Sequence, residues 1–176
     1  ARFGFSDATE IFVFCSGMAS AIAFGGTFGS NGFLIGTGRV AYRVWQVYWS
    51  HVGMVLAVIA LLALADARGW GDPAKTYVET LPILPFFEET GAALIGLLTL
   101  TWVPNYFDIL PMYLVILALI PAVMAAHRAG GPLGAAALVA AAALAAQAGW
   151  LDLPSRPWAP EIPWFFNPFG WQLVFF

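Results

Sequence analysis

Charged side chains are so widely spaced along this chain that they divide it into six long apolar intervals. A helix needs roughly 20 mostly apolar residues to cross the hydrocarbon core of a membrane. Five of the intervals reach or approach that length, and the last, which starts near Ile162, is shorter. We therefore predict an all-α, polytopic membrane helix bundle that forms a single transmembrane domain over residues 1–176. The five predicted spans cover residues 8–27, 42–65, 88–104, 109–127 and 132–150, and residues 166–176 begin a further span.

Glycine and proline set the predicted ends of several spans. The Gly-rich stretch from Gly25 to Gly38 is predicted to end the first helix and to serve as a flexible connector. Pro104 lacks a backbone donor and is predicted to end the third span, while Asp108 is predicted to N-cap the fourth.

Composition excludes several classes of protein. Hydrophobic residues make up 61% of the chain and charged residues 10%, whereas a soluble domain carries about 25% charged residues. The net charge is −3 and basic residues form no cluster, so we expect no nucleic-acid partner. Cys15 is the only cysteine, which excludes a disulfide framework. No metal-ligand spacing is present, and we expect no metal and no bound cofactor.

The ends and loops of the chain give weaker signals. The first residue is Ala, and the last hydrophobic segment stops at Phe176, so we expect a fragment of a longer polypeptide. Lys and Arg are spread too evenly to decide the orientation. The polar connection between Asp66 and Glu89 carries five carboxylates and is taken as extracytoplasmic, which places Arg39 and Arg43 on the cytoplasmic side.

Polar residues follow one face of the second predicted span. Arg39, Arg43, Ser50 and His51 fall within a single arc of that helix, and a polar stripe in a membrane helix usually lines a cavity. The two arginines could equally extend to the phosphate-rich interface, and either arrangement attracts an anion. For His51 we expect a hydrogen bond to a neighbouring helix rather than proton transfer.

Asp7 and Glu10 stand three residues apart at the start of the first predicted span. This spacing is typical of a capping box. It also places two carboxylates on one helix face, where they could act chemically, and the two interpretations are compatible.

Two segments interrupt the apolar pattern with aromatic and amide residues. The first, residues 102–111, holds Asn105, Tyr106 and Asp108, which is more hydrogen-bonding capacity than a turn needs. The second, residues 165–172, holds Asn167 and Gln172. Irregular backbone at membrane depth is tolerated only against protein or water, so both segments could border one site. Their aromatic residues also fit an interfacial belt.

Four stretches in this order carry a resemblance to a known family: FGFSDATEIFVFCSG, RVAYRVWQVYWSHVG, VPNYFDILPMYLVILALIP and FFNPFGWQLVFF. Together they resemble the OpgC family, which is similar to the broader acyltransferase-3 group. The resemblance implies a multi-pass enzyme of the bacterial inner membrane. It would transfer succinyl groups from succinyl-CoA to hydroxyls of osmoregulated periplasmic glucans. Its partners would be the lipid bilayer, the acyl-CoA donor and the glucan acceptor, and its oligomeric state stays open.

The residue pattern and the resemblance together indicate which residues could form the functional site. The catalytic candidates are Asp7, Glu10, His51, Asn105 and Asp108, and the substrate-binding candidates are Arg39, Arg43, Ser50, Tyr106, Asn167 and Gln172.

One departure from the family's pattern limits these assignments. In acyltransferase-3-like proteins the histidine credited as general base lies on the first span, which would precede Ala1. We therefore expect this chain alone to be inactive and do not assign His51 as the base. A membrane transporter, which also uses broken helices, and a non-catalytic scaffold are the alternative functions.

Overall fold

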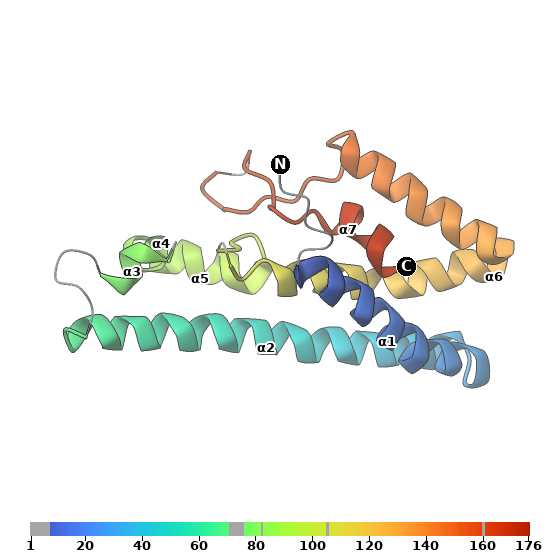
Figure 1. Ribbon diagram of the computed structural model, residues 1–176, viewed down its shortest axis with the longest axis horizontal. Helices are drawn as coiled ribbons and strands as arrows, with labels where there is room; N and C mark the ends of the chain where they lie inside the picture. Colours follow the sequence, from blue (N-terminus) through green and yellow to red (C-terminus); the bar gives the residue numbers. More distant parts are fainter. Residues whose placement is uncertain (1–7, 71–75, 82, 105, 160) are drawn as a thin grey trace. The chain divides into compact units, whose positions relative to one another are not determined.

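The computed structural model describes residues 8–70, 76–81, 83–104, 106–159 and 161–176, and this part of the chain is helical (Figure 1). No strand occurs among these residues, where the one bridge of β type pairs Pro154 with Pro163. The predicted all-α class is therefore confirmed. The helices are α1 (Ala8–Ser30), α2 (Phe33–Ala67), α3 (Tyr77–Thr80), α4 (Leu84–Glu88), α5 (Thr90–Thr99), α6 (Ile109–Gln147) and α7 (Pro168–Phe175).

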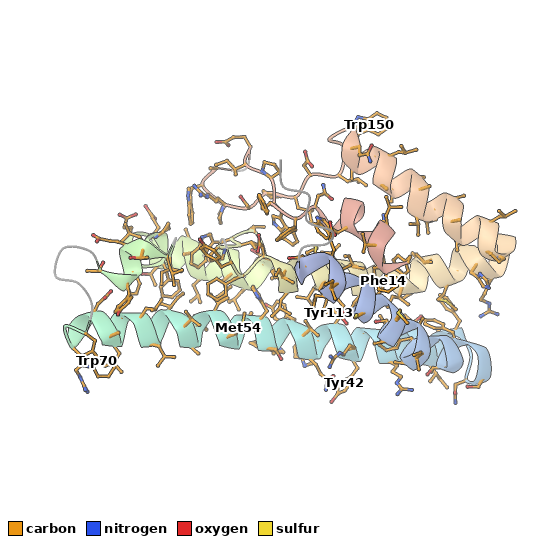
Figure 2. The ribbon with its side chains drawn as sticks, viewed as in Figure 1. Phe14, Tyr42, Met54, Trp70, Tyr113 and Trp150 are labelled. Atoms are coloured by element: carbon orange, nitrogen blue, oxygen red, sulfur yellow. The ribbon has the colours of Figure 1, made fainter. Side chains whose placement is uncertain are left out.

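Three helices, α1, α2 and α6, are long and apolar enough to cross a membrane. Their outward residues are apolar as well: Ile22 is 81% exposed, Leu34 85% and Leu133 83%. Figure 2 shows large side chains such as Tyr42, Trp70 and Trp150 standing away from the ribbon. An apolar surface of this kind is unfavourable in water and suits lipid. The prediction of a membrane protein is therefore confirmed. The predicted number of about five spans is not confirmed, because three described helices are long enough to cross.

The Gly-rich stretch is not the flexible connector that we predicted. Helix α1 continues to Ser30 and α2 starts at Phe33, so only Asn31 and Gly32 separate them. Gly32 has φ +86, a conformation that glycine adopts without steric cost. The intrinsic preference of glycine is overridden because a helix satisfies every backbone group internally, as an apolar membrane requires.

Helix α6 contains a break. Gly130 and Gly131 have non-helical backbone angles, and Pro132 starts the following stretch. The ribbon reverses its direction here, where Figure 1 turns to orange. Gly134 lies so close to the carbonyl oxygen of Ala126 that a Cβ would come within 2.6 Å of it. The break lies between residues 127 and 132, where the sequence predicted the boundary between two spans.

The described chain divides into two compact units. Unit 1 comprises residues 1–46, 112–152 and 166–176, and unit 2 comprises residues 47–111 and 153–165. In unit 1, α1 packs against α7. The ring of Tyr113 on α6 lies 5.8 Å from that of Phe12 and 6.2 Å from that of Phe175, measured between centroids. One aromatic residue therefore joins three helices.

Unit 2 has its own apolar core. Val52, Val55 and Ile59 form one stripe of α2 at helical spacing. They pack with residues of the segment that follows: Ile83, Ala93, Leu97, Trp102 and Phe107. The hydroxyl of Tyr48 donates a hydrogen bond of 2.6 Å to the carbonyl oxygen of Leu98, which ties α2 to α5.

The predicted span 88–104 is not one continuous helix. Helix α5 has 10 residues, or about 15 Å at 1.5 Å per residue, which is half of the roughly 30 Å hydrocarbon core. It ends at Thr99, before Pro104, because Leu100 adopts a left-handed conformation with φ 57. The chain then turns back, and the Trp102 ring stacks on Phe86 at 6.0 Å between centroids. Gly96 permits this return, since a Cβ there would come within 2.6 Å of the Trp102 Cβ.

We predict that Gly17→Ala destabilises unit 1. A Cβ at Gly17 would overlap the backbone carbonyl of Phe175, so α1 and α7 must separate. Overpacking of this kind costs about 1–3 kcal/mol. The measurement is thermal unfolding of the full-length protein in detergent.

Gly26→Ala is the matched control, because a Cβ there meets no described atom within 4 Å. The control should gain up to about 1 kcal/mol in helix propensity. Equal midpoints for both variants would contradict the α1–α7 contact.

Candidate functional site

Unit 1 contains a polar groove of about 410 Å³, here called the arginine groove. Its two charged groups, Arg39 and Arg43, both come from α2 and stand one helical turn apart. Helices α1 and α6 supply the opposite walls. The lining residues are Ala19, Ser20, Ala23, Phe24, Arg39, Tyr42, Arg43, Gln46 and Tyr113.

A hydrogen bond holds one of the two guanidinium groups in place. Arg39 donates from Nη1 to the Thr27 hydroxyl at 2.9 Å, and that hydroxyl donates to the carbonyl oxygen of Ala23 at 3.3 Å. Guanidinium groups bind phosphate and carboxylate with two parallel hydrogen bonds. The groove therefore offers two cations, one of them positioned, to an anionic ligand.

An apolar cavity of about 190 Å³ lies beside this groove and shares Ser20 and Phe24 with it. It is enclosed by α1, the first part of α6 and α7. Its lining residues are Gly17, Ser20, Ala21, Phe24, Gly25, Phe28, Ile120, Val123, Met124, Phe175 and Phe176. The two cavities together offer cationic and apolar surfaces side by side.

Unit 2 contains a second polar cavity, of about 280 Å³, here called the Asp108 cavity. It combines one carboxylate, one guanidinium and several aromatic rings. The lining residues are Pro85, Trp102, Val103, Pro104, Asp108, Ser155, Arg156, Ile162, Pro163, Trp164 and Phe165.

Backbone pairing builds this cavity from irregular segments. The segment 153–165 folds back on itself: Ser155 N donates to Ile162 O and Trp164 N to Leu153 O, both at 2.8 Å. Val103 N donates to Ser155 O at 3.0 Å, so the segment after α5 pairs with this hairpin. The Trp164 indole also donates to Pro154 O at 2.8 Å. These bonds satisfy backbone groups that a helix would otherwise pair, as a membrane protein requires.

Asp108 is the buried charge of this cavity, with 8% of its surface exposed. It directly precedes α6, the position that the sequence predicted for an N-cap. Burial raises the pKa of this carboxyl above its ordinary value, while the backbone N–H groups of Asp108 and Ile109 oppose the shift by favouring the charged form. The carboxylate is therefore less stable here than in water.

The structure distributes the predicted site residues over both units. Unit 1 holds Glu10, which is exposed on α1, together with Arg39, Arg43, Asn167 and Gln172; unit 2 holds Ser50, His51, Tyr106 and Asp108. Only the two arginines share a cavity within this set. Asp7 and Asn105 lie outside the described residues. Tyr106 is 78% exposed and has φ 77.

The amide residues near the C-terminus bond within the chain. The Asn167 side chain caps α7 by accepting from Phe169 N at 2.9 Å. Its amide donates to Leu151 O at 3.2 Å and to Asp152 Oδ1 at 3.0 Å. Gln172 is buried and donates to Phe169 O at 2.9 Å. These bonds position α7, and the substrate-binding role assigned to both residues stays a prediction.

For His51 we expected a hydrogen bond to a neighbouring helix, and the described structure shows none. Its side chain is fully buried in α2, yet neither ring nitrogen has a hydrogen-bond partner among the described residues. It also lines neither the arginine groove nor the Asp108 cavity. A buried polar group without a partner is costly, so among the described residues of unit 2 the side chain of His51 is the least satisfied.

Three residues of the Asp108 cavity were missed by sequence reasoning: Ser155, Arg156 and Trp164. They stand in a Pro-rich connection that the apolar pattern left outside every span. The available signal was Arg156 itself, a charged residue followed by several aromatic residues. Among the described residues, no group of three His, Cys, Asp or Glu side chains could hold a metal ion.

We predict that His51→Leu raises the stability of the protein. The substitution removes two buried polar atoms that lack partners, and such groups cost about 1–3 kcal/mol each. Thermal unfolding of the full-length protein in detergent measures the effect. Val55→Ala, at a fully buried position of the same helix, is the control and should lower the midpoint. A lower midpoint for His51→Leu would show that the imidazole has a partner in the membrane.

We predict that Asp108→Asn stabilises the protein at neutral pH, and that this gain shrinks as the pH falls. The folded-state pKa is raised, so the charged carboxylate disfavours the folded state above that pKa. Below the ordinary pKa the wild-type carboxyl is protonated in both states, and the penalty disappears. Unfolding midpoints of both proteins at several pH values provide the test. The exposed Glu88→Gln in α4 is the control and should change little. A gain that grows on acidification would contradict the sign of the shift.

Comparison with family models identifies the chain over its full length. Comparison with curated proteins and comparison with solved structures find no match. The model for the OpgC protein matches residues 1–176. This match covers all four stretches that carry the resemblance seen in the sequence and confirms it. The chain therefore belongs to the OpgC protein family.

Proposed function

We propose that this protein takes part in a membrane-embedded O-acyltransferase reaction that moves an acyl group, succinyl, from an acyl-CoA donor to hydroxyls of periplasmic glucans. Two findings support the proposal: membership of the OpgC protein family and the apolar helices suited to a membrane. The observation that carries it is the arginine groove, because this reaction needs a cationic site for the phosphates of the donor.

The arginine groove is assigned to the donor. Arg39 and Arg43 would each face a phosphate, and the bond from Arg39 to Thr27 lowers the entropy lost when a ligand binds. Tyr42, Trp45 and Trp49 of α2 are exposed near the two arginines. Aromatic residues of this kind favour the membrane interface, where a soluble donor arrives.

The neighbouring apolar cavity suits the uncharged arm of an acyl-CoA. That arm links the phosphates to the thioester and carries no charge, so it would lie on a surface without charged groups beside the cationic site. The shared residues Ser20 and Phe24 provide this continuity. A ligand with phosphates alone would leave the apolar cavity unused.

The chemical step is an acyl transfer between sulfur and oxygen. A glucan hydroxyl attacks the thioester carbonyl, a C–O bond forms, the C–S bond breaks, and CoA leaves as the thiolate. The proton of the hydroxyl passes to a general base. No described residue is assigned as this base, because His51 lines neither polar cavity. The described residues would thus dock and orient the substrates.

We predict that Arg43→Ala raises the KM for acyl-CoA about tenfold, since a charge-assisted hydrogen bond contributes about 1.5–3 kcal/mol. Initial rates are measured with the full-length protein in lipid nanodiscs. Acyl-dephospho-CoA serves as a second donor, and the preference of the wild type for acyl-CoA should shrink in the variant. Arg68→Gln, at an exposed position beyond α2, is the control and should keep the wild-type KM. An unchanged KM for Arg43→Ala would remove the groove from donor binding.

The proposed reaction as a whole is tested in cells. Periplasmic glucans are isolated with and without the complete gene, and their charge and mass are compared. We expect deletion to remove negative charge and a succinyl-sized mass from the glucans. Identical glucans from both strains would overturn the proposed acceptor.

A further inference from the structure

The donor docking proposed above does not use the Asp108 cavity, whose walls come from two irregular segments that pair through backbone hydrogen bonds. Backbone hydrogen bonds from two separate segments close it. Asp108 and Ser155 are both more than nine-tenths buried, and Arg156 is exposed. Burying a carboxylate costs free energy unless it is compensated. The backbone N–H groups of Asp108 and Ile109 compensate only part of this cost, so a ligand that donates hydrogen bonds would stabilise the carboxylate further.

The charged side chains that line the cavity indicate which kind of ligand would be complementary to it. One carboxylate and one guanidinium offer an acceptor-only group and a donor-only group and add no net charge. An anion would be repelled by Asp108 and a cation by Arg156. The complementary ligand is therefore neutral overall and carries groups that both donate and accept hydrogen bonds. Hydroxyl groups have this property.

The aromatic lining narrows the ligand class. Trp102, Trp164 and Phe165 line the cavity, and the Trp158 ring lies 6.4 Å from that of Trp102 between centroids. Phe165 is 80% exposed. Flat aromatic faces with few neighbouring polar groups suit a ligand that has an apolar C–H face as well as a hydroxylated edge. Sugar rings combine the two.

We propose that the Asp108 cavity is a saccharide subsite that binds a neutral hexose unit of a glucan chain, with hydroxyls on Asp108 and Arg156 and a ring face against the aromatic residues. Its identification as the acceptor subsite rests on the proposed function, whereas the binding of the saccharide does not. The volume of about 280 Å³ is just below the range of small-molecule pockets, roughly 300–1,000 Å³. It therefore admits one ring and leaves the rest of the chain outside, where Phe165 is exposed.

The position of the cavity agrees with an extracytoplasmic ligand. Pro85 belongs to the polar connection before α5, Trp102 follows α5, and both line the same cavity. The chain between them therefore enters and returns without crossing. The cavity lies on the side of the connection 66–89, which the sequence predicts as extracytoplasmic. A complete span over residues 88–104 would have carried Trp102 to the opposite side.

The test measures binding of gluco-oligosaccharides to the full-length protein in lipid nanodiscs, without donor, by calorimetry and by tryptophan fluorescence. We expect saturable binding that Asp108→Asn and Arg156→Gln each weaken about tenfold. Phe165→Ala should weaken binding too, and its exposed side chain poses little risk to folding. Glu88→Gln and Arg68→Gln are the charge-matched controls and should bind like the wild type. Unfolding midpoints confirm that each variant is folded.

The outcomes separate this inference from the proposed function. Saccharide binding that requires Asp108, Arg156 and Phe165 supports the subsite, even if no acyl transfer is found. Acyl transfer to glucans by a protein whose three variants keep wild-type saccharide affinity would overturn the subsite alone. Absence of saccharide binding would overturn it as well. Glycerophosphoethanolamine, a phosphodiester that is also neutral overall, is added as a competitor. Binding of glycerophosphoethanolamine in place of the oligosaccharide would assign the cavity to a lipid headgroup and reject the proposal.

Discussion

Every backbone N–H and C=O group of this protein that lies in the membrane must find a partner within the protein, and most of the described structure follows from that constraint. It keeps the Gly-rich stretch 25–38 helical apart from Asn31 and Gly32. It also explains why the irregular segments after α5 and between 153 and 165 pair with each other through Val103 N and Ser155 O. In these two irregular segments, hydrogen bonds between segments replace those that a helix would have made.

Glycine residues determine where two segments of the described structure come into close contact. Gly17 brings α1 into backbone contact with α7, and Gly96 lets Trp102 return against α5. The first contact encloses the apolar cavity of unit 1, and the second forms a wall of the Asp108 cavity in unit 2. In lipid, close approach through small residues replaces much of the hydrophobic driving force that packs soluble proteins. Both cavities therefore depend on the absence of a side chain at one position.

Charged groups inside such a protein are costly in free energy. The arginine groove and the Asp108 cavity differ in which charged groups line them. The arginine groove is cationic and lies beside an apolar cavity, which suits the proposed donor with its phosphates and its uncharged arm. The Asp108 cavity is lined by one carboxylate, one guanidinium and several aromatic rings, which suits the proposed hydroxylated ligand. His51 fits neither description, because its ring has no hydrogen-bond partner in the described part of the chain. The described contacts give no reason for a histidine at this position.

The sequence by itself determined the helical membrane class, the family and the cationic face of α2, because apolar length and the 3.6-residue period are local properties of the chain. It also located the break between 127 and 132, where two glycines precede a proline. It did not determine the short α5, because Leu100, Gly96 and Trp102 form that return only by packing together. Nor did it place Arg156 and Asp108 in the lining of one cavity, since the two are far apart in sequence and the pairing of Val103 with Ser155 joins their segments. Hydrogen bonds and contacts between distant segments produce no periodic pattern in the sequence, so only the tertiary structure showed them.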